Sequence, residues 1–503
     1  MKIQLIRLSI YLLPFQVFGF TQAQGGFGTV EPAAIPLIIL IILSFVQSGF
    51  QPLKAFGQKQ QIYSILLFLI LAIIVTIFSF LLDKYDSYYR SIGVLVSLIF
   101  LLLIYYVISA AIKSPIESKQ LCQDFLKVSI FIGFTVILEY LIVLLTGVNF
   151  WRIILNSIGG GLPYPSIYGL YLDRYRSSVL LYDQDIFQGI LREPADVGIY
   201  LMPALAIIIQ ALLSGTLNKG KKLSAILVVI MMGWATVLSS SLTNYFAIAV
   251  LFLYFMVISK KNQIKKHIFS TFFKIFSIFA IITFTTWMMF IFRNNFSEGI
   301  ANRLNDLSAF WESSKLLNPS NLKDSDIGTG NLSVGVILNS YSTAIYALQN
   351  SPFVGLGLGN FVWGFESAAP FQEGLLGKLN KYDGYSMLSR LLVESGIVGT
   401  ICFIWIFWSR ANQIRYFFTR IILIENSLLR KHYLYLAKIG LAISVGAMSE
   451  LGFLMLNRPS YWNVVFPLLF GICFKSNLSF FYFDRGKDIN KIAVIKTDEA
   501  RNY

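Results

Sequence analysis

The run Ile62–Leu82 (IYSILLFLILAIIVTIFSFLL) decides the fold of this chain. It contains no charged residue, and its length matches the ~20 apolar residues that an α-helix needs to cross the hydrocarbon core of a bilayer. A segment this long and this apolar predicts a transmembrane helix rather than the core of a soluble domain.

Runs of the same kind recur along the whole sequence. The chain has 503 residues, of which 56% are hydrophobic and 13% are charged, whereas charged residues make up about 25% of an average soluble domain. The sequence therefore predicts an all-α polytopic membrane protein, a single integral membrane domain over residues 1–503 with about twelve transmembrane helices. We expect these helices at residues 4–23, 33–49, 62–82, 92–112, 128–146, 197–214, 223–238, 243–259, 268–292, 386–409, 433–456 and 461–474.

Two stretches are too polar to lie in lipid, and we expect both to form large loops on the external face. They are residues 147–196 and residues 293–385. Within the second loop a set of apolar residues recurs at helical spacing, which predicts an amphipathic helix against the membrane surface or the helix bundle. The members of this set are Val334, Ile337, Leu338, Tyr341, Ile345 and Leu348. We expect the helix to stop at the turn that precedes Pro352.

The net charge of +15 follows the predicted topology. The segments expected in the cytoplasm hold more Lys and Arg than the external segments, although the external segments are longer. The positive-inside rule therefore places both termini in the cytoplasm, including the tail 475–503. Acidic lipid headgroups account for a basic inner face, so no nucleic-acid partner is expected. As an alternative, the first helix could be a cleaved signal, because Lys2 and Arg7 precede a short apolar run.

The positions of cysteine and histidine exclude two kinds of external site. Cys122, Cys402 and Cys473 fall in a cytoplasmic loop or in helices, so no disulfide framework is expected outside the membrane. His267 and His432 lie in expected cytoplasmic loops, which excludes an external histidine base or metal ligand. The external loops show no acidic cluster of metal-binding spacing, and we predict an activity that needs no metal and no cofactor.

Three stretches resemble motifs of the bacterial O-antigen ligase and polymerase superfamily. Residues 352–361 (PFVGLGLGNF) resemble its Pro-x-x-Gly-x-Gly-x-x-x-Phe element. Residues 386–399 (SMLSRLLVESGIVG) look like the helix that follows its large external loop and ends in Glu-x-Gly-Ile-x-Gly. Residues 189–198 (GILREPADVG) are similar to its Gly-Phe-x-x-Glu-Pro stretch at the start of a helix.

The resemblance implies an enzyme that acts on sugar chains carried by undecaprenyl diphosphate at the outer leaflet of a bacterial plasma (inner) membrane. Ligases of this superfamily usually carry a histidine about nine residues before the Glu-x-Gly, and this chain has Tyr385 there. The family often has an arginine in the amphipathic helix, where this chain has Asn339 and Ser340. The first departure favours a Wzy-type polysaccharide repeat-unit polymerase. A chain-length regulator and a flippase are the partner proteins that this interpretation allows, besides the lipids around the chain.

The implied reaction needs cations for a departing diphosphate and a base for an acceptor hydroxyl. Arginine suits the first task because its fork matches phosphate oxygens in pairs. Arg192 is the first candidate because it lies at the predicted membrane–water boundary, although an interface anchor is an equal interpretation. The further candidates are Arg176 and Arg174, then Arg303 and Arg458.

Glu193 and Asp383 are the candidate bases, with helix-start and turn roles as the alternatives. We expect Glu394 to have a buried structural role rather than a chemical one. Pro352, Gly355, Gly357 and Gly359 are expected to shape their loop, and a phosphate cradle is the alternative use.

The leading hypothesis is a polymerase of repeat units for O-antigen, capsular polysaccharide or exopolysaccharide. An O-antigen ligase that transfers finished glycan to another acceptor is the close alternative. A lipid-linked oligosaccharide flippase or other transporter is a third candidate, for which charged or broken helices at mid-membrane and an internal repeat are expected.

Overall fold

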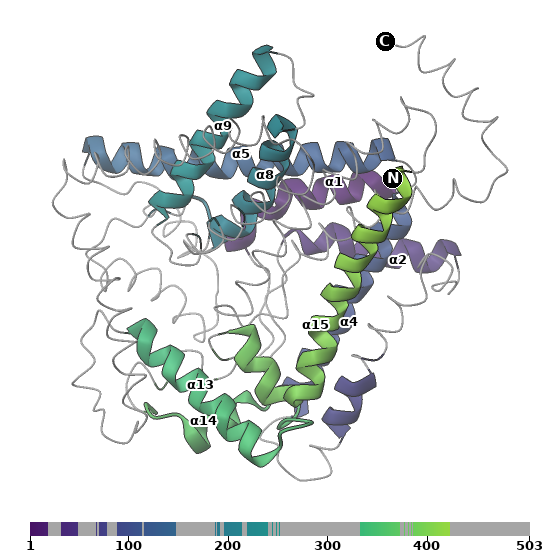
Figure 1. Cartoon of the computed structure of the whole chain (residues 1–503), viewed down its shortest axis with the longest axis vertical. Helices are drawn as coiled ribbons and strands as arrows, with labels where there is room; N and C mark the ends of the chain where they lie inside the picture. The colour runs from purple at the N-terminus through teal and green to yellow at the C-terminus, as the bar shows by residue number, and fades with distance from the viewer. Residues whose placement is uncertain are drawn as a thin grey trace.

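The computed structural model of the chain describes the residues in the following list. They are 1–18, 32–48, 67, 70–77, 88–112, 115–146, 187, 189–191, 196–213, 219–239, 244, 248, 251, 332–372, 377, 381, 384 and 386–422. All regular structure in this part of the chain is helical, with no strand (Figure 1). The elements are α1 (Lys2–Leu12), the 3₁₀-helix η1 (Leu13–Phe18), α2 (Ala34–Ser48), α4 (Tyr88–Ala111), α5 (Pro115–Thr146), α8 (Asp196–Leu213), α9 (Lys219–Leu238), α13 (Leu332–Asn350), α14 (Phe361–Ala368) and α15 (Met387–Ile422).

The predicted helical character of the fold is confirmed for the described residues. Three of their helical segments are long and apolar enough to cross a membrane, namely Gln120–Thr146, Gly220–Leu238 and Met387–Trp405. The count of about twelve helices stays a prediction. The helices predicted at 268–292, 433–456 and 461–474, and most of those at 62–82 and 243–259, lie outside the described residues.

The helix predicted at 128–146 is longer than expected, because α5 already begins at Pro115. Its charged first turns suggested a cytoplasmic loop, but Asp124 is buried against α1. There its carboxylate accepts hydrogen bonds from Arg7 Nε at 2.7 Å and from the Tyr11 hydroxyl at 2.8 Å. Lys127 Nζ donates to the same carboxylate at 3.3 Å. Because its charge is offset by these partners, Asp124 can continue the helix where a loop was predicted.

The amino-terminal helices share one apolar core. α5 packs against α1, α8 and α9, and its Phe125 and Ile132 are fully buried. Tyr200 of α8 is also fully buried, and its hydroxyl donates to the carbonyl of Leu13 at 3.2 Å. Ser129 of α5 donates to the carbonyl of Tyr200 at 3.1 Å, which fixes α8 against α5.

α4 links this group to the carboxyl-terminal helices. It packs against α1 and α2, and it overlaps α15 in Figure 1. Its Val94 and Leu98 share an apolar cluster with Leu358 and with Leu391 of α15. Ser91 adds a hydrogen bond of 2.6 Å from its hydroxyl to the carbonyl of Leu358.

The predicted amphipathic helix exists as α13, and its most deeply buried face is not the predicted apolar stripe, which the sequence placed against either the membrane surface or the helix bundle. Apart from Val336, its buried side chains are polar or small: Asn339, Ser340, Thr343, Ala344 and Ala347 are all buried. Ile345 of the predicted apolar stripe is 55% exposed. Small residues let α13 lie close to α14 and α15, its main neighbours, and this close packing decides which face is inside.

Candidate functional site

α15 is two helical segments joined at a break. Gly396 has φ 64° and ψ −166°, a conformation that is essentially restricted to glycine. The first segment begins at Met387, directly after Ser386. The hydroxyl of Ser386 accepts a hydrogen bond from the backbone N–H of Ser389 at 3.1 Å. This contact is a serine N-cap, because it satisfies one of the free N–H groups of the first turn.

The break binds the turn that follows α13. Four backbone hydrogen bonds join this turn to the residues around the break. They run from Leu356 N to Val393 O at 2.6 Å, from Gly357 N to Glu394 O at 3.1 Å, from Ile397 N to Pro352 O at 2.9 Å, and from Val398 N to Phe353 O at 3.3 Å. In an uninterrupted helix, the carbonyls of 393 and 394 would accept from the N–H groups of 397 and 398. Two hydrogen bonds within the helix are therefore replaced by four hydrogen bonds between the turn and the break. We call residues 352–357 and 393–398 the glycine junction.

Two glycines allow this approach. A Cβ on Gly396 would lie 2.5 Å from the carbonyl carbon and oxygen of Phe353, and 2.7 Å from Gly355 N. A Cβ on Gly355 would lie 2.6 Å from Gly396 N and from Val393 O. Any side chain at either position would push the two backbones apart. Gly357 and Gly359 also have positive φ, 101° and 79°.

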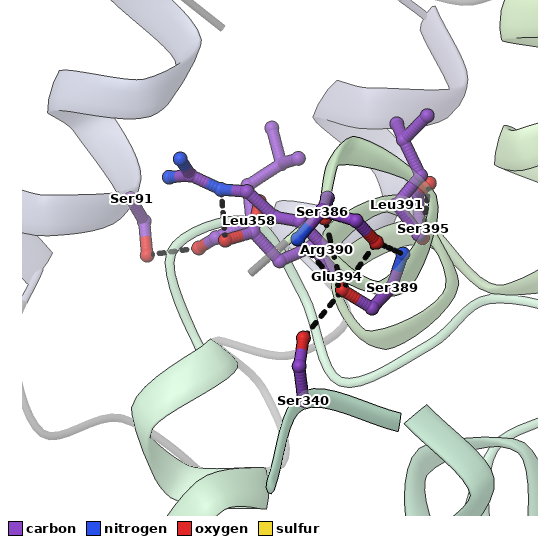
Figure 2. Close-up of polar contacts among 9 residues, drawn as sticks. All are labelled: Ser91, Ser340, Leu358, Ser386, Ser389, Arg390, Leu391, Glu394 and Ser395. Atoms are coloured by element: carbon purple, nitrogen blue, oxygen red, sulfur yellow. Dashed lines mark hydrogen bonds and ion pairs between the residues drawn. The ribbon is translucent and has the colours of Figure 1, made fainter. Parts of the chain in front are cut away.

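Hydroxyl and amide groups tie α13 to the elements beside the junction. Ser340 of α13 points to Ser389 at the start of α15, and their hydroxyl oxygens are 2.6 Å apart (Figure 2). Asn339 donates through Nδ2 to the carbonyl of Phe371 at 2.8 Å and accepts from the Phe371 N–H at 2.9 Å. Asn339 and Ser340, at the place of the family's arginine, therefore bind protein groups.

A buried ion pair lies on the first segment of α15. Arg390 Nε donates to Glu394 Oε1 at 3.0 Å (Figure 2). The Glu394 side chain is fully buried and that of Arg390 is 10% exposed. The pair was not predicted as a unit. Its signal in the sequence is the spacing of four residues between an arginine and a glutamate inside an apolar helix.

The family-like motif at residues 189–198 also contacts a buried carboxylate. Glu139 of α5 is buried and accepts a hydrogen bond from the backbone N–H of Gly189 at 2.8 Å. Gly189 has φ 62°, and a Cβ there would collide with the Thr135 side chain. This contact fixes the chain just before Arg192 against α5.

The candidate chemical residues of the sequence lie outside the described residues, so their roles stay predictions. They are Arg192, Glu193, Arg174, Arg176, Arg303, Arg458 and Asp383, together with Tyr385. The described part of the chain contains no group of three or more His, Cys, Asp or Glu residues that could hold a metal ion.

Comparison with known proteins identifies the family that these motifs resemble. Residues 227–404 match the family model described as O-antigen ligase. The matched range includes α13, the turn after it, α14 and both sides of the break in α15, but not the first motif at residues 189–198. No curated protein matches the chain.

The match confirms the resemblance to the O-antigen ligase and polymerase superfamily. It supports a glycan-transferring membrane enzyme of polysaccharide biosynthesis in general. The match does not separate polymerase from ligase.

Proposed function

We propose that this protein is a polymerase that joins undecaprenyl-diphosphate-linked oligosaccharide repeat units at the outer face of a bacterial plasma membrane. The product is O-antigen, capsular polysaccharide or exopolysaccharide. The observation that carries the proposal is the glycine junction, because it joins two of the three motifs that suggested the family, and both lie within the range that matches the family model.

In the proposed reaction a hydroxyl of one lipid-linked repeat unit attacks the anomeric carbon of another lipid-linked glycan. A glycosidic C–O bond forms, the bond from the anomeric carbon to the diphosphate oxygen breaks, and the hydroxyl proton passes to a base. Cations near the departing diphosphate stabilise its charge. We assign this role to Arg192, with Arg176, Arg174, Arg303 and Arg458 as further candidates, and the role of base to Glu193 or Asp383.

Arg390 and Glu394 have a different role in this proposal. Because Arg390 Nε is bound to Glu394 and both side chains are buried, we assign the pair to positioning the first segment of α15. Pro352, Gly355, Gly357 and Gly359 hold the turn against that segment. These residues affect the reaction only indirectly, by holding the external residues that contact the substrate in position.

One residue favours a polymerase over a ligase. Tyr385 replaces the histidine usual in ligases. Asn339, where the family often has an arginine, is neutral and bound to the backbone of Phe371, so another residue must supply the cation in either kind of enzyme.

The break in α15 and the buried Glu139 of α5 favour the transporter alternative, since discontinuous helices and charged residues within membrane spans are typical of transporters. The family match favours the enzyme over the transporter.

Deletion of the gene followed by gel analysis of the surface glycan tests the proposal. A polymerase mutant should still display a single capped repeat unit, because transfer to the acceptor does not depend on polymerisation. A ligase or flippase mutant should display no glycan at all. Restoration of long chains by a plasmid copy of the gene is the control, and a deletion strain that keeps long chains would refute the proposal.

A further inference from the structure

The charges of α15 set the depth of the glycine junction in the membrane. The first charged residue after Glu394 is Arg410, which the positive-inside rule places at the cytoplasmic boundary. The helical rise from Gly396 to Arg410 is about 21 Å at 1.5 Å per residue. The hydrocarbon core is about 30 Å thick, so this second segment alone cannot cross it. The break at Gly396 therefore lies about 9 Å below the outer edge of the hydrocarbon.

The turn after α13 must lie at the same depth, because four backbone hydrogen bonds hold it to the break. Non-helical backbone at membrane depth is tolerated where its polar groups are satisfied within the protein. The junction meets this condition at further groups: Gly355 N donates to Ser351 O at 2.9 Å, and Asn360 Nδ2 donates to Leu356 O at 2.8 Å. Asn350, just before the turn, directs its amide back to the carbonyl of Tyr346 at 2.8 Å.

The side chains that the turn presents outward are apolar. Phe353 is 67% exposed and Val354 is 37% exposed, whereas Leu356 is buried. The adjoining segment of α15 exposes Ile397, Ile401 and Ile404, which share one helix face. In water such a surface would be unfavourable, but at hydrocarbon depth it matches its surroundings.

We propose that residues 351–357 form a re-entrant turn, with the side chains of Phe353 and Val354 in contact with the acyl chains of the outer leaflet. This differs from the expectation that 293–385 forms an external loop too polar to lie in lipid. The turn then anchors the end of α13 to the bilayer. The proposal depends on the membrane span of α15 and is independent of the reaction that the protein catalyses.

Nitroxide labels at single cysteines measure the depth directly. In a background with Cys122, Cys402 and Cys473 replaced by serine, Phe353→Cys and Val354→Cys are labelled and reconstituted into phosphatidylcholine–phosphatidylglycerol vesicles. Power saturation then compares collisions of the label with oxygen, which concentrates in hydrocarbon, and with a water-soluble nickel chelate. Ile401→Cys is the hydrocarbon reference.

Gln372→Cys, outside the junction on an exposed side chain, is the water reference. We expect both turn labels to collide with oxygen more than with the nickel chelate, as the label at Ile401 does. Two labels are used so that a folding defect of one variant, detected by its elution profile, leaves the other to decide. A water-like ratio at the turn would overturn the proposal. So would low collision with both reagents, because it would indicate a contact with protein instead of lipid.

Discussion

Replacement of Gly396 by alanine tests the central feature of the site. Alanine cannot adopt φ 64° and ψ −166° without strain. Its Cβ would also lie 2.5 Å from the carbonyl group of Phe353. The chain can respond by keeping the break under strain or by straightening α15 and releasing the turn.

The cost of either response can be worked out from the structure. A residue other than glycine in this backbone conformation costs about 1–3 kcal/mol. The close contact of the new Cβ with the carbonyl group of Phe353 adds to this cost. Straightening α15 loses the four bonds of the junction and regains two helical bonds. At roughly 0.5–1.5 kcal/mol per net hydrogen bond, this loss is about 1–3 kcal/mol. We therefore expect Gly396→Ala to lower the free energy of unfolding by about 2 kcal/mol or more.

Two matched substitutions have the opposite expected sign. Gly220 in α9 has no atom within 4 Å of an added Cβ, and Gly133 in α5 has its nearest atom at 3.4 Å. Alanine is favoured over glycine in a helix by about 1 kcal/mol. Gly220→Ala and Gly133→Ala should therefore leave stability unchanged or raise it.

The assay has two readouts. Unfolding of the purified protein by sodium dodecyl sulfate in mixed micelles gives the change in free energy, and gel analysis of surface glycan gives the chain length in cells. We expect Gly396→Ala to be less stable and to lose long chains, while both controls keep them. If Gly396→Ala matched the controls in stability and in glycan length, the account of the glycine junction would be wrong.

Four further predictions follow from the ion pair, the α13 contact, the proposed site and the expected chemistry. Arg390→Met removes the partner of Glu394 and should cost about 3–5 kcal/mol; the double replacement Arg390→Met with Glu394→Met should recover most of this in the same unfolding assay, and a double variant no more stable than the single one would contradict the pairing. Asn339→Ala should cost about 1–3 kcal/mol and speed hydrogen exchange at the Phe371 amide, while unchanged exchange would show that the contact does not protect it. Arg192→Ala should abolish long glycan chains at a normal protein level, whereas unchanged chain length would remove this arginine from the proposed site. Finally, a chelator should leave polymerisation by reconstituted protein intact, and loss of the reaction would refute metal independence.

The sequence predicted the helices better than it predicted their faces. Apolar runs gave the position of α2, α8 and α9 to within a few residues, because membrane spans carry a strong one-dimensional signal. The beginning of α5 was wrong, because the charge of Asp124 is offset by Arg7, a residue far away in the sequence.

The buried face of α13 was not predicted, because the sequence left open whether its apolar stripe lies against the membrane surface or the helix bundle. Apolar periodicity selects the inner face correctly when the alternative surroundings are water. Beside lipid that rule fails, because apolar side chains can face outward at no cost and small residues pack inside. The exposed Ile345 and the buried Thr343 of α13 agree with an apolar stripe that faces the membrane surface.

The sequence motifs of the site were predicted, but the side-chain contacts within it were not. The glycines of residues 352–359 and Gly396 were visible as unusual residues, and their resemblance to a family was recognised. The ion pair of Arg390 with Glu394 was not predicted as a unit, although its spacing is local. The contact of Ser340 with Ser389 had no signal, since two serines distant in sequence share no pattern.

The sequence by itself determined that this chain is a membrane protein, that its regular structure is helical, and which family its motifs resemble. These properties depend on composition and on short local patterns, and each residue carries them wherever the rest of the chain lies. Only the tertiary structure decided that the turn after α13 binds inside the break of α15. Each hydrogen bond of that junction needs two backbone groups about forty residues apart to come within about 3 Å, and such proximity is a property of the folded chain alone.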